Sequence, residues 1–137
     1  MIKRVCVYLD KGLGLTCVTS LRVVETMHTR KALMAELADA FIAMPGGYGT
    51  AEEFFEALTW AQLGLHAKPC GLLNVHGYFD HLIRFVDHAV QERFLDSAHR
   101  GLLLVDDAPE ALLAQLDSWQ PPPVDKAAWA TRLLKEV

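Results

Sequence analysis

The feature that most constrains this chain is an apolar run that ends in a glycine-rich turn. Residues 40–44 read Ala-Phe-Ile-Ala-Met, and residues 45–50, here called the glycine loop, read Pro-Gly-Gly-Tyr-Gly-Thr. A short apolar run without alternation predicts a strand buried on both faces. Apolar residues then recur at helical spacing from Thr50 to about Gly64. These residues predict a strand–turn–helix unit, the repeating unit of a parallel sheet.

The rest of the chain repeats this alternation. Further strands are predicted at residues 3–9, 21–24, 68–75 and 101–105, and further helices at residues 28–39, 79–95 and 108–119. The alternation predicts an α/β fold with three layers, in which a parallel sheet lies between helices on both faces. A chain of 137 residues suits one domain. Residues 1–118 are predicted to form it, and residues 119–137 a proline-containing tail with a short docking helix.

Composition narrows the class of protein. The net charge of −4 argues against binding to nucleic acid by bulk charge. No stretch reaches the roughly 18 apolar residues of a membrane span, and the N-terminus does not read as a signal peptide. Cys6, Cys17 and Cys70 are odd in number and far apart, which favours buried free thiols over a disulfide framework or a zinc site. We therefore expect a soluble, cytoplasmic protein without a metal.

The start of the helix after the glycine loop has two interpretations. Thr50 and Glu53 fit a capping box, with Thr50 at the N-cap, and this structural role accounts for the first turn. It does not account for Gly46, Gly47 and Gly49, because a tight turn needs one or two glycines. Three glycines let the backbone approach a bound group and point several amides at it. Nucleotide or sugar-phosphate binding is favoured over a bare turn, although the loop is neither a P-loop nor a G-x-G-x-x-G motif.

A second group of polar residues lies upstream, in the sequence Met-His-Thr-Arg-Lys. Arg30 falls on the apolar side of its predicted helix, so it must reach solvent at the rim or pair with another group. A rim position and a ligand contact are equally compatible with the spacing. Lys31 next to it is expected to be solvated. Thr59 lies two turns beyond Glu53 and is predicted to be roughly on the same side of the helix.

Together these residues resemble a known family. The sequence Pro-Gly-Gly-Tyr-Gly-Thr-Ala-Glu-Glu fits the pattern Pro-Gly-Gly-x-Gly-Thr-x-x-Glu, and Arg30 stands 23 residues before Glu53. Residues 21–116 resemble the LOG family of cytokinin riboside 5′-monophosphate phosphoribohydrolases, which carry an older "lysine decarboxylase-like" label. Decarboxylation would require a pyridoxal lysine or a similar electron sink, which the sequence does not identify, so we reject that label.

The resemblance implies a Rossmann-like homodimer that hydrolyses the N-glycosidic bond of nucleoside 5′-monophosphates, such as AMP or an N6-prenyladenosine monophosphate. It implies Arg30 and Glu53 as the catalytic pair, and no metal or redox cofactor. The substrate-binding residues that it implies are Lys31, Gly46, Gly47, Tyr48, Gly49, Thr50 and Thr59. An oxocarbenium-like sugar in the transition state is consistent with a nearby carboxylate.

The sequence departs from the family in its N-terminal part. Members carry a Cys-Gly-Ser-Ser-type loop and a further glycine-rich loop ahead of the arginine, and neither has a counterpart here. The fold is therefore expected to be shortened in its N-terminal half. The chain is therefore one of three kinds of protein: a LOG-type hydrolase in short form, a non-catalytic nucleotide-binding module, or an inactive fragment.

Overall fold

The computed structural model describes residues 5–8 and 24–122. Within these residues four parallel strands form one sheet in the order β1-β2-β3-β4, so that each strand pairs with the next in sequence. The strands are β1 (Val5–Tyr8), β2 (Ala40–Ala43), β3 (Cys70–Leu73) and β4 (Leu103–Asp106). The predicted parallel sheet is confirmed. In a parallel sheet the carboxyl ends of all strands lie at one edge, where ligands bind in folds of this class.

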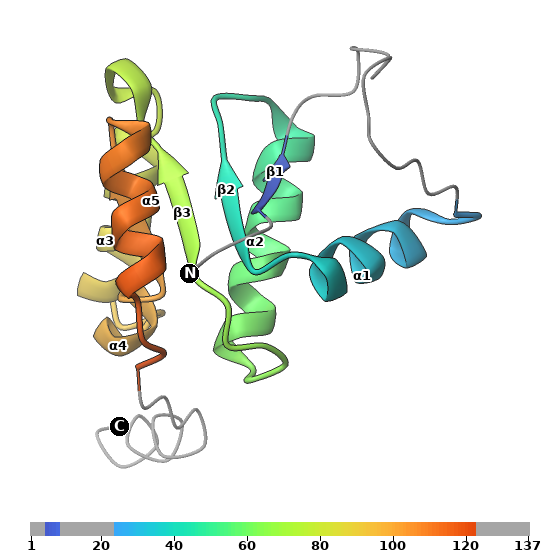
Figure 1. Ribbon diagram of the computed structural model, residues 1–137. Coiled ribbons are helices and arrows are strands. Elements are labelled where there is room, and N and C mark those ends of the chain that lie inside the picture. Colours follow the sequence, from blue (N-terminus) through green and yellow to red (C-terminus); the bar gives the residue numbers. More distant parts are fainter. Residues whose placement is uncertain (1–4, 9–23, 123–137) are drawn as a thin grey trace.

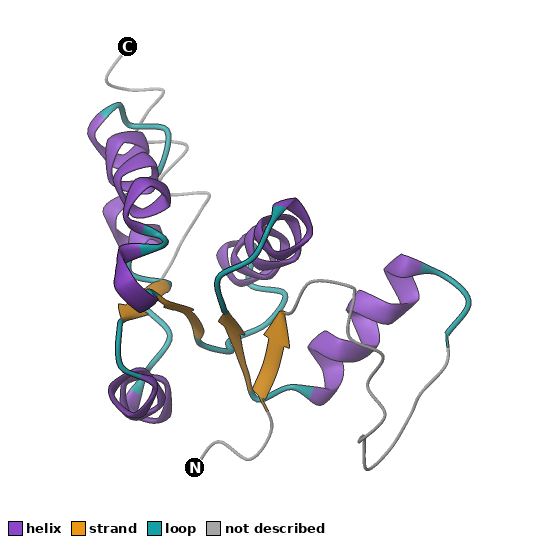
Figure 2. Ribbon diagram, turned by 90° about the horizontal axis from the view of Figure 1, so that it is seen from above, coloured by secondary structure: helices purple, strands orange, loops and turns teal. Residues whose placement is uncertain are grey.

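Helices connect the strands and cover both faces of the sheet (Figures 1 and 2). The α-helices are α1 (Met27–Leu37), α2 (Tyr48–Gln62), α3 (Asp80–Gln91), α4 (Ser97–Arg100) and α5 (Pro109–Ser118), and a 3₁₀ turn, η1, spans Val75–Gly77. The three-layer, Rossmann-like α/β architecture predicted from the sequence is thus observed in shortened form.

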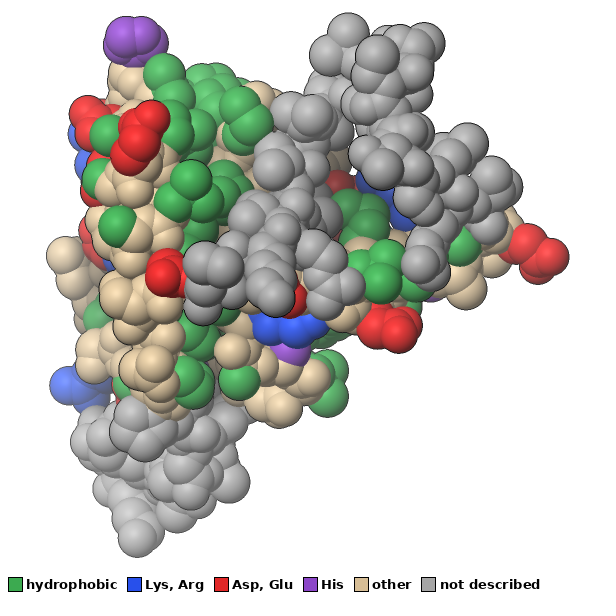
Figure 3. Space-filling view, in the orientation of Figure 1, with side chains coloured by type: hydrophobic (Ala, Val, Ile, Leu, Met, Phe, Trp, Pro, Cys, Tyr) green, Lys and Arg blue, Asp and Glu red, His purple; other side chains and the backbone are tan. Residues whose placement is uncertain are grey.

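The core has two parts, one on each face of the sheet. On one face, Phe41 and Leu72 of the sheet pack with Phe54 of α2 and Val86 of α3. On the other face, α5 packs against the strands in a cluster that contains Ala40, Ile42, Leu73, Leu112 and Leu116. Figure 3 looks onto this second face, where apolar side chains form a band beside α5. The alternation of neighbouring strand residues between two cores explains why the apolar run of β2 contains no polar position.

Helix α1 is held differently from the others. None of its residues is buried, and Met34 and Ala35 only pack against the margin of the core. Its C-terminal end is bound by Lys68, whose ammonium donates to the carbonyl of Ala35 and, at 3.3 Å, to that of Glu36. Apolar burial therefore contributes little to holding α1 against the rest of the domain, and polar contacts contribute more.

A half-buried histidine organises the connection from α2 to β3. The Nδ1 atom of His66 accepts the backbone N–H of Lys68 at 3.2 Å, and its Nε2 donates to the carbonyl of Ala57 at 3.0 Å. The ring also lies 5.2 Å from the ring of Phe41, centroid to centroid. Both nitrogens are used by the neutral ring, and burial lowers the pKa of His66.

Several sequence predictions need correction. The helix predicted at residues 79–95 is too long, because α3 ends at Gln91 and Arg93 adopts a left-handed φ of 63°. The strand predicted at residues 21–24 lies outside the described residues except for Val24, which is not in a strand. The docking helix predicted in the tail also lies outside them. The division at residue 118 stays a prediction, although α5 ends there.

Candidate functional site

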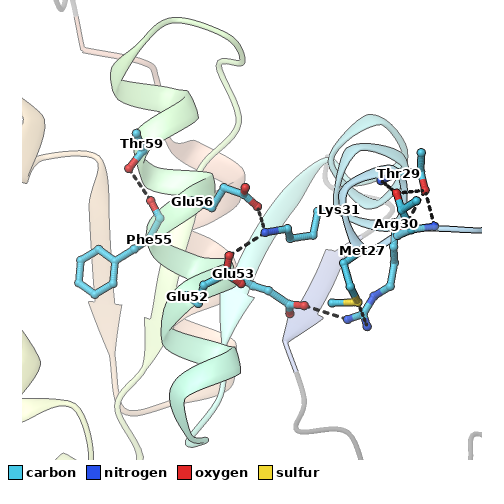
Figure 4. A network of polar contacts seen from close by, with 10 residues as sticks. Met27, Thr29, Arg30, Lys31, Glu52, Glu53, Phe55, Glu56 and Thr59 are labelled. Atoms are coloured by element: carbon cyan, nitrogen blue, oxygen red, sulfur yellow. Dashed lines mark hydrogen bonds and ion pairs between the residues drawn. The ribbon is translucent and has the colours of Figure 1, made fainter.

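The site is built where the start of α1 faces the start of α2. Helix α1 begins after Thr26, whose side chain accepts the backbone N–H of Thr29 at 3.1 Å, and the Thr29 hydroxyl accepts the N–H of Thr26 at 3.1 Å. This reciprocal capping fixes the first turn of the helix. Arg30 and Lys31 follow immediately, so their side chains project from a well-defined helix start towards α2 (Figure 4).

Helix α2 begins earlier than predicted. Its N-cap is Gly47, without a side-chain capping bond, and the backbone N–H of Ala51 donates to the carbonyl of Gly47 at 3.2 Å. The predicted capping box of Thr50 and Glu53 is therefore wrong. Thr50 is the third residue of the helix, and the carboxylate of Glu53 turns to a charged partner, which binds it more strongly than a backbone amide would.

The charged partner of Glu53 is Arg30. A guanidinium nitrogen of Arg30 lies 2.9 Å from a carboxylate oxygen of Glu53, and the side chain of Glu53 is only 8% exposed while that of Arg30 is 33% exposed. The pair thus has one shielded carboxylate and one cation that reaches solvent. The other guanidinium nitrogen lies 3.9 Å from the sulfur of Met27. The structure brings together the two residues that the family resemblance implies as the catalytic pair.

Lys31 is bound to two carboxylates, contrary to the expectation that it is simply solvated. Its ammonium lies 2.7 Å from the carboxylate of Glu52 and 2.9 Å from that of Glu56, and its side chain is 10% exposed. The hydrogen bond that the Lys31 ammonium donates to Glu52, followed by the one to Glu56, raises the pKa of Lys31. Figure 4 shows the lysine between the two glutamates. Glu52 and Glu56 thus bind Lys31, and Glu53 binds Arg30.

The glycine loop lies at the carboxyl edge of the sheet, directly after β2. An added Cβ at Gly46 would lie 2.3 Å from the hydroxyl oxygen of Thr50, whereas one at Gly47 or Gly49 would meet no atom within 4 Å. Gly46 is therefore required by the packing of the loop itself. Tyr48 is 97% exposed, and Thr50 is buried with its hydroxyl turned back against Gly46. Within the part of the chain that the structure describes, this hydroxyl has no hydrogen-bond partner.

Sequence reasoning missed one residue that contacts this loop. The phenol of Tyr78, in the connection from β3 to α3, donates to the carbonyl of Gly46 at 2.7 Å. Only the adjacency of parallel strand ends could have suggested the contact, because 32 positions separate the two residues. By contrast, the structure does not bring Thr59 to Arg30 and Glu53. Its hydroxyl donates to the carbonyl of Phe55 at 2.7 Å, on the side of α2 turned away from Lys31 (Figure 4).

Two of the cavities that adjoin α2 lie between it and a neighbouring helix. A small one lies between α1 and α2, and it is lined by residues that include Lys31, Glu53 and Trp60. A larger one of about 100 Å³ lies between α2 and α3, and its lining includes Phe55 and Thr59. Trp60 lies seven residues after Glu53 in α2, so its side chain can belong to the core or stack on a ligand. It is half-buried beside Lys31 and Glu53.

Among residues 5–8 and 24–122, no three His, Cys, Asp or Glu side chains are grouped so that they could hold a metal ion. Cys70 is a buried free thiol, as predicted, and burial raises its pKa to about 12. The side chains of Cys6 and Cys17 lie outside the description. None of the described helices is long and apolar enough to span a membrane.

Comparison with known proteins agrees with the motifs. Residues 10–116 match the model of a family described as "Possible lysine decarboxylase". The chain is 55% identical over 100 residues to the cytokinin riboside 5′-monophosphate phosphoribohydrolase of Rhodococcoides fascians. The aligned residues make up 73% of this chain and 50% of that protein. It is also 51% identical over 100 residues to LOG7 of Arabidopsis thaliana, whose name gives the same activity. Here the aligned residues make up 73% of this chain and 46% of LOG7. A rice relative, the probable phosphoribohydrolase LOGL5, is 51% identical over 107 residues, covering 78% of this chain and 44% of LOGL5. The chain therefore spans about half the length of these relatives.

Proposed function

Because this chain belongs to the LOG family, we propose that it hydrolyses the N-glycosidic bond of nucleoside 5′-monophosphates. The products would be the free base and ribose 5-phosphate. The observation that carries the proposal is the ion pair of 2.9 Å between Arg30 and the shielded carboxylate of Glu53. Glu53 lies in the second turn of the helix that begins within the glycine loop, so the site combines a carboxylate for the sugar with backbone amides for a phosphate.

The glycine loop supports a phosphate site. The first backbone N–H groups of α2 have no partners within the helix, and the dipole of the helix favours an anion there. Gly47 has a φ of −92°, which any residue adopts, and a side chain there would meet no protein atom. The fold therefore does not require glycine at this position. The open space beside Gly47 and Gly49 is what a bound phosphate would use.

Glu53 is proposed to act on the reacting sugar. Cleavage of the glycosidic bond passes through an oxocarbenium-like transition state, and a carboxylate close to C1′ stabilises its positive charge or orients the attacking water. Arg30 orients this carboxylate and, from its exposed side, adds a positive charge for the substrate phosphate. Binding of the phosphate, which does not react, would hold the sugar in position for cleavage.

The test is release of base from the purified chain. Wild type, Glu53→Gln and the control Glu110→Gln, which removes an exposed carboxylate from α5, are incubated with AMP and with N6-prenyladenosine monophosphate. Free base is then measured by chromatography. We expect Glu53→Gln to lower kcat by roughly 100-fold or more, and Glu110→Gln to leave it unchanged. Matched circular dichroism spectra and melting temperatures would show that the glutamine variant is folded.

The outcomes separate the alternatives. Full activity of Glu53→Gln would remove Glu53 from the chemistry. AMP binding by a wild-type chain that releases no base would favour a non-catalytic nucleotide-binding module. That alternative deserves a direct measurement, because the chain spans about half the length of its relatives. Neither binding nor release would favour an inactive fragment.

We also propose that the protein is a cytoplasmic homodimer that binds no nucleic acid. The dimer is supported by exposed aromatic side chains in α3 and shortly after it, where Phe85 is 63% and Phe94 81% exposed. The net charge of −4 disfavours a nucleic-acid partner. Light scattering coupled to size-exclusion chromatography measures the oligomeric state, and a monomer at micromolar concentration would contradict the dimer.

A further inference from the structure

Tyr78 is the one side chain from another connection that hydrogen-bonds the glycine loop in the described part of the chain. Its hydroxyl donates to the carbonyl of Gly46 at 2.7 Å. The contact joins the connection after β3 to the loop after β2, and these two strands are neighbours in the sheet. Their carboxyl ends meet at one edge, so the tyrosine lies beside the proposed phosphate site.

The tyrosine is held in place by its own connection. The ring of Tyr78 stands edge-on to that of Phe79, with 5.0 Å between centroids and an interplanar angle of 89°. Phe79 is buried, and its backbone N–H donates to the side-chain oxygen of Asn74 at 2.7 Å. The amide nitrogen of Asn74 donates to Asp80 at 2.9 Å. The phenol therefore projects from a turn fixed at both ends.

The contact determines the direction of one amide. The carbonyl of Gly46 and the N–H of Gly47 belong to the same planar trans peptide, so they point in opposite directions. When Tyr78 fixes the carbonyl, it also fixes the direction of the Gly47 N–H. Gly46 also faces the side chain of Thr50, where an added Cβ would lie 2.3 Å from the hydroxyl oxygen. Gly47 is the N-cap of α2, where an anion is favoured.

From this geometry we infer that Tyr78 is a positioning residue, which aims the Gly47 amide at the 5′-phosphate of the substrate. The inference rests on the proposed function, because it assigns the loop to a phosphate monoester. Tyr78 acts through the loop and need not touch the substrate. Its removal should therefore affect ligands with a 5′-phosphate and spare the nucleoside that lacks one.

The test compares Tyr78→Phe, which removes only the hydroxyl, with the control Ser118→Ala, which removes a hydroxyl bonded only within α5. Affinities for AMP and for adenosine are measured by titration calorimetry. We expect Tyr78→Phe to weaken AMP binding by roughly 2- to 10-fold, the effect of one neutral hydrogen bond, with no change for adenosine. In turnover, KM for AMP should rise and kcat should change less than twofold. Equal affinity for AMP, or equal weakening towards AMP and adenosine, would overturn the inference.

A measurement without ligand separates this inference from the proposed function. In ¹⁵N NMR spectra of the free chain, Tyr78→Phe should shift the amide signal of Gly47 and speed its hydrogen exchange, whereas Ser118→Ala should do neither. If the wild type binds AMP but releases no base, and the differences above persist, the hydrolase proposal fails and the role of Tyr78 stands. If the wild type is active and Tyr78→Phe matches it in KM and in the Gly47 signal, the hydrolase proposal stands and the role of Tyr78 falls. A wild-type chain that does not bind AMP overturns the role of Tyr78 as well.

Discussion

Replacing Gly46 by alanine tests the packing of the glycine loop. The new Cβ would lie 2.3 Å from the hydroxyl oxygen and 3.0 Å from the Cβ of Thr50, and the second atom is fixed by the backbone of α2. Inserting a methyl group into such a contact costs about 1–3 kcal/mol of the free energy of unfolding. For a chain of this size each kcal/mol lowers the melting temperature by about 3–5 °C, so Gly46→Ala should melt about 3–15 °C below wild type.

The chain offers a matched control and a rescue for this substitution. Gly47→Ala introduces the same group one residue later, where it meets no atom within 4 Å, and should stay within about 0.5 kcal/mol of wild type. Thr50→Ala removes the clashing oxygen, so it should restore part of the stability lost in Gly46→Ala. The assay is urea unfolding of the four corners of the Gly46–Thr50 double-mutant cycle. A coupling energy on the order of 1 kcal/mol is expected.

Two results would refute this reasoning. Equal melting temperatures of Gly46→Ala and Gly47→Ala would mean that Gly46 is not required by packing. Strict additivity of Gly46→Ala and Thr50→Ala would mean that the clash is relieved elsewhere in the loop.

Two further predictions concern titratable groups outside the proposed catalytic pair. Lys31→Met leaves Glu52 and Glu56 without their shared cation. The free energy of unfolding should therefore fall by about 0.5–1 kcal/mol at low salt and by less in 1 M NaCl. An effect that does not depend on salt would contradict this prediction. Because the folded-state pKa of Lys31 is raised, its contribution is fully present below pH 10.5 and should be lost as pH rises beyond that value. His66 has a lowered pKa in the folded state, so its contribution to stability is present above about pH 6.5 and lost as pH falls through the folded pKa. Denaturant titrations should therefore show that the free energy of unfolding falls less between pH 7.5 and pH 5 in His66→Gln than in wild type. The exposed control His88→Gln should show the same fall as wild type. Equal falls in the two variants would refute the assignment to His66.

The strand–helix alternation was readable because each buried strand is an uninterrupted apolar run. Residues 40–44 predicted β2, and the structure places Ala40–Ala43 in the sheet centre with all four residues buried. The pairing of Arg30 with Glu53 was suggested by a resemblance, not by periodicity, because ion pairs between helices depend on how the helices cross. The start of α2 was misplaced for a related reason. Thr50 and Glu53 match a capping pattern in the local sequence, but α2 begins after Gly47 and the carboxylate of Glu53 binds Arg30.

Tyr78 shows the remaining limit of sequence reasoning. Its contact with Gly46 joins two connections that are adjacent only because β2 and β3 are neighbours. An isolated tyrosine after a strand carries no local signal of such a contact. The end of α3 was also missed, because Arg93 adopts a left-handed conformation that glycine or asparagine usually marks. Long-range contacts and unusual backbone angles at ordinary residues thus account for these two errors.

The two residues of the proposed catalytic pair belong to helices that are buried to different extents. Glu53 belongs to a helix with four buried residues, whereas Arg30 belongs to a helix with none. Segments with little buried apolar surface open at a lower free energy than the core. Heating or mild denaturant should therefore detach the arginine while the carboxylate, the sheet and most of the helix content are still in place. Activity would then be lost before the fold, and the working range of the site would be narrower than the stability of the domain.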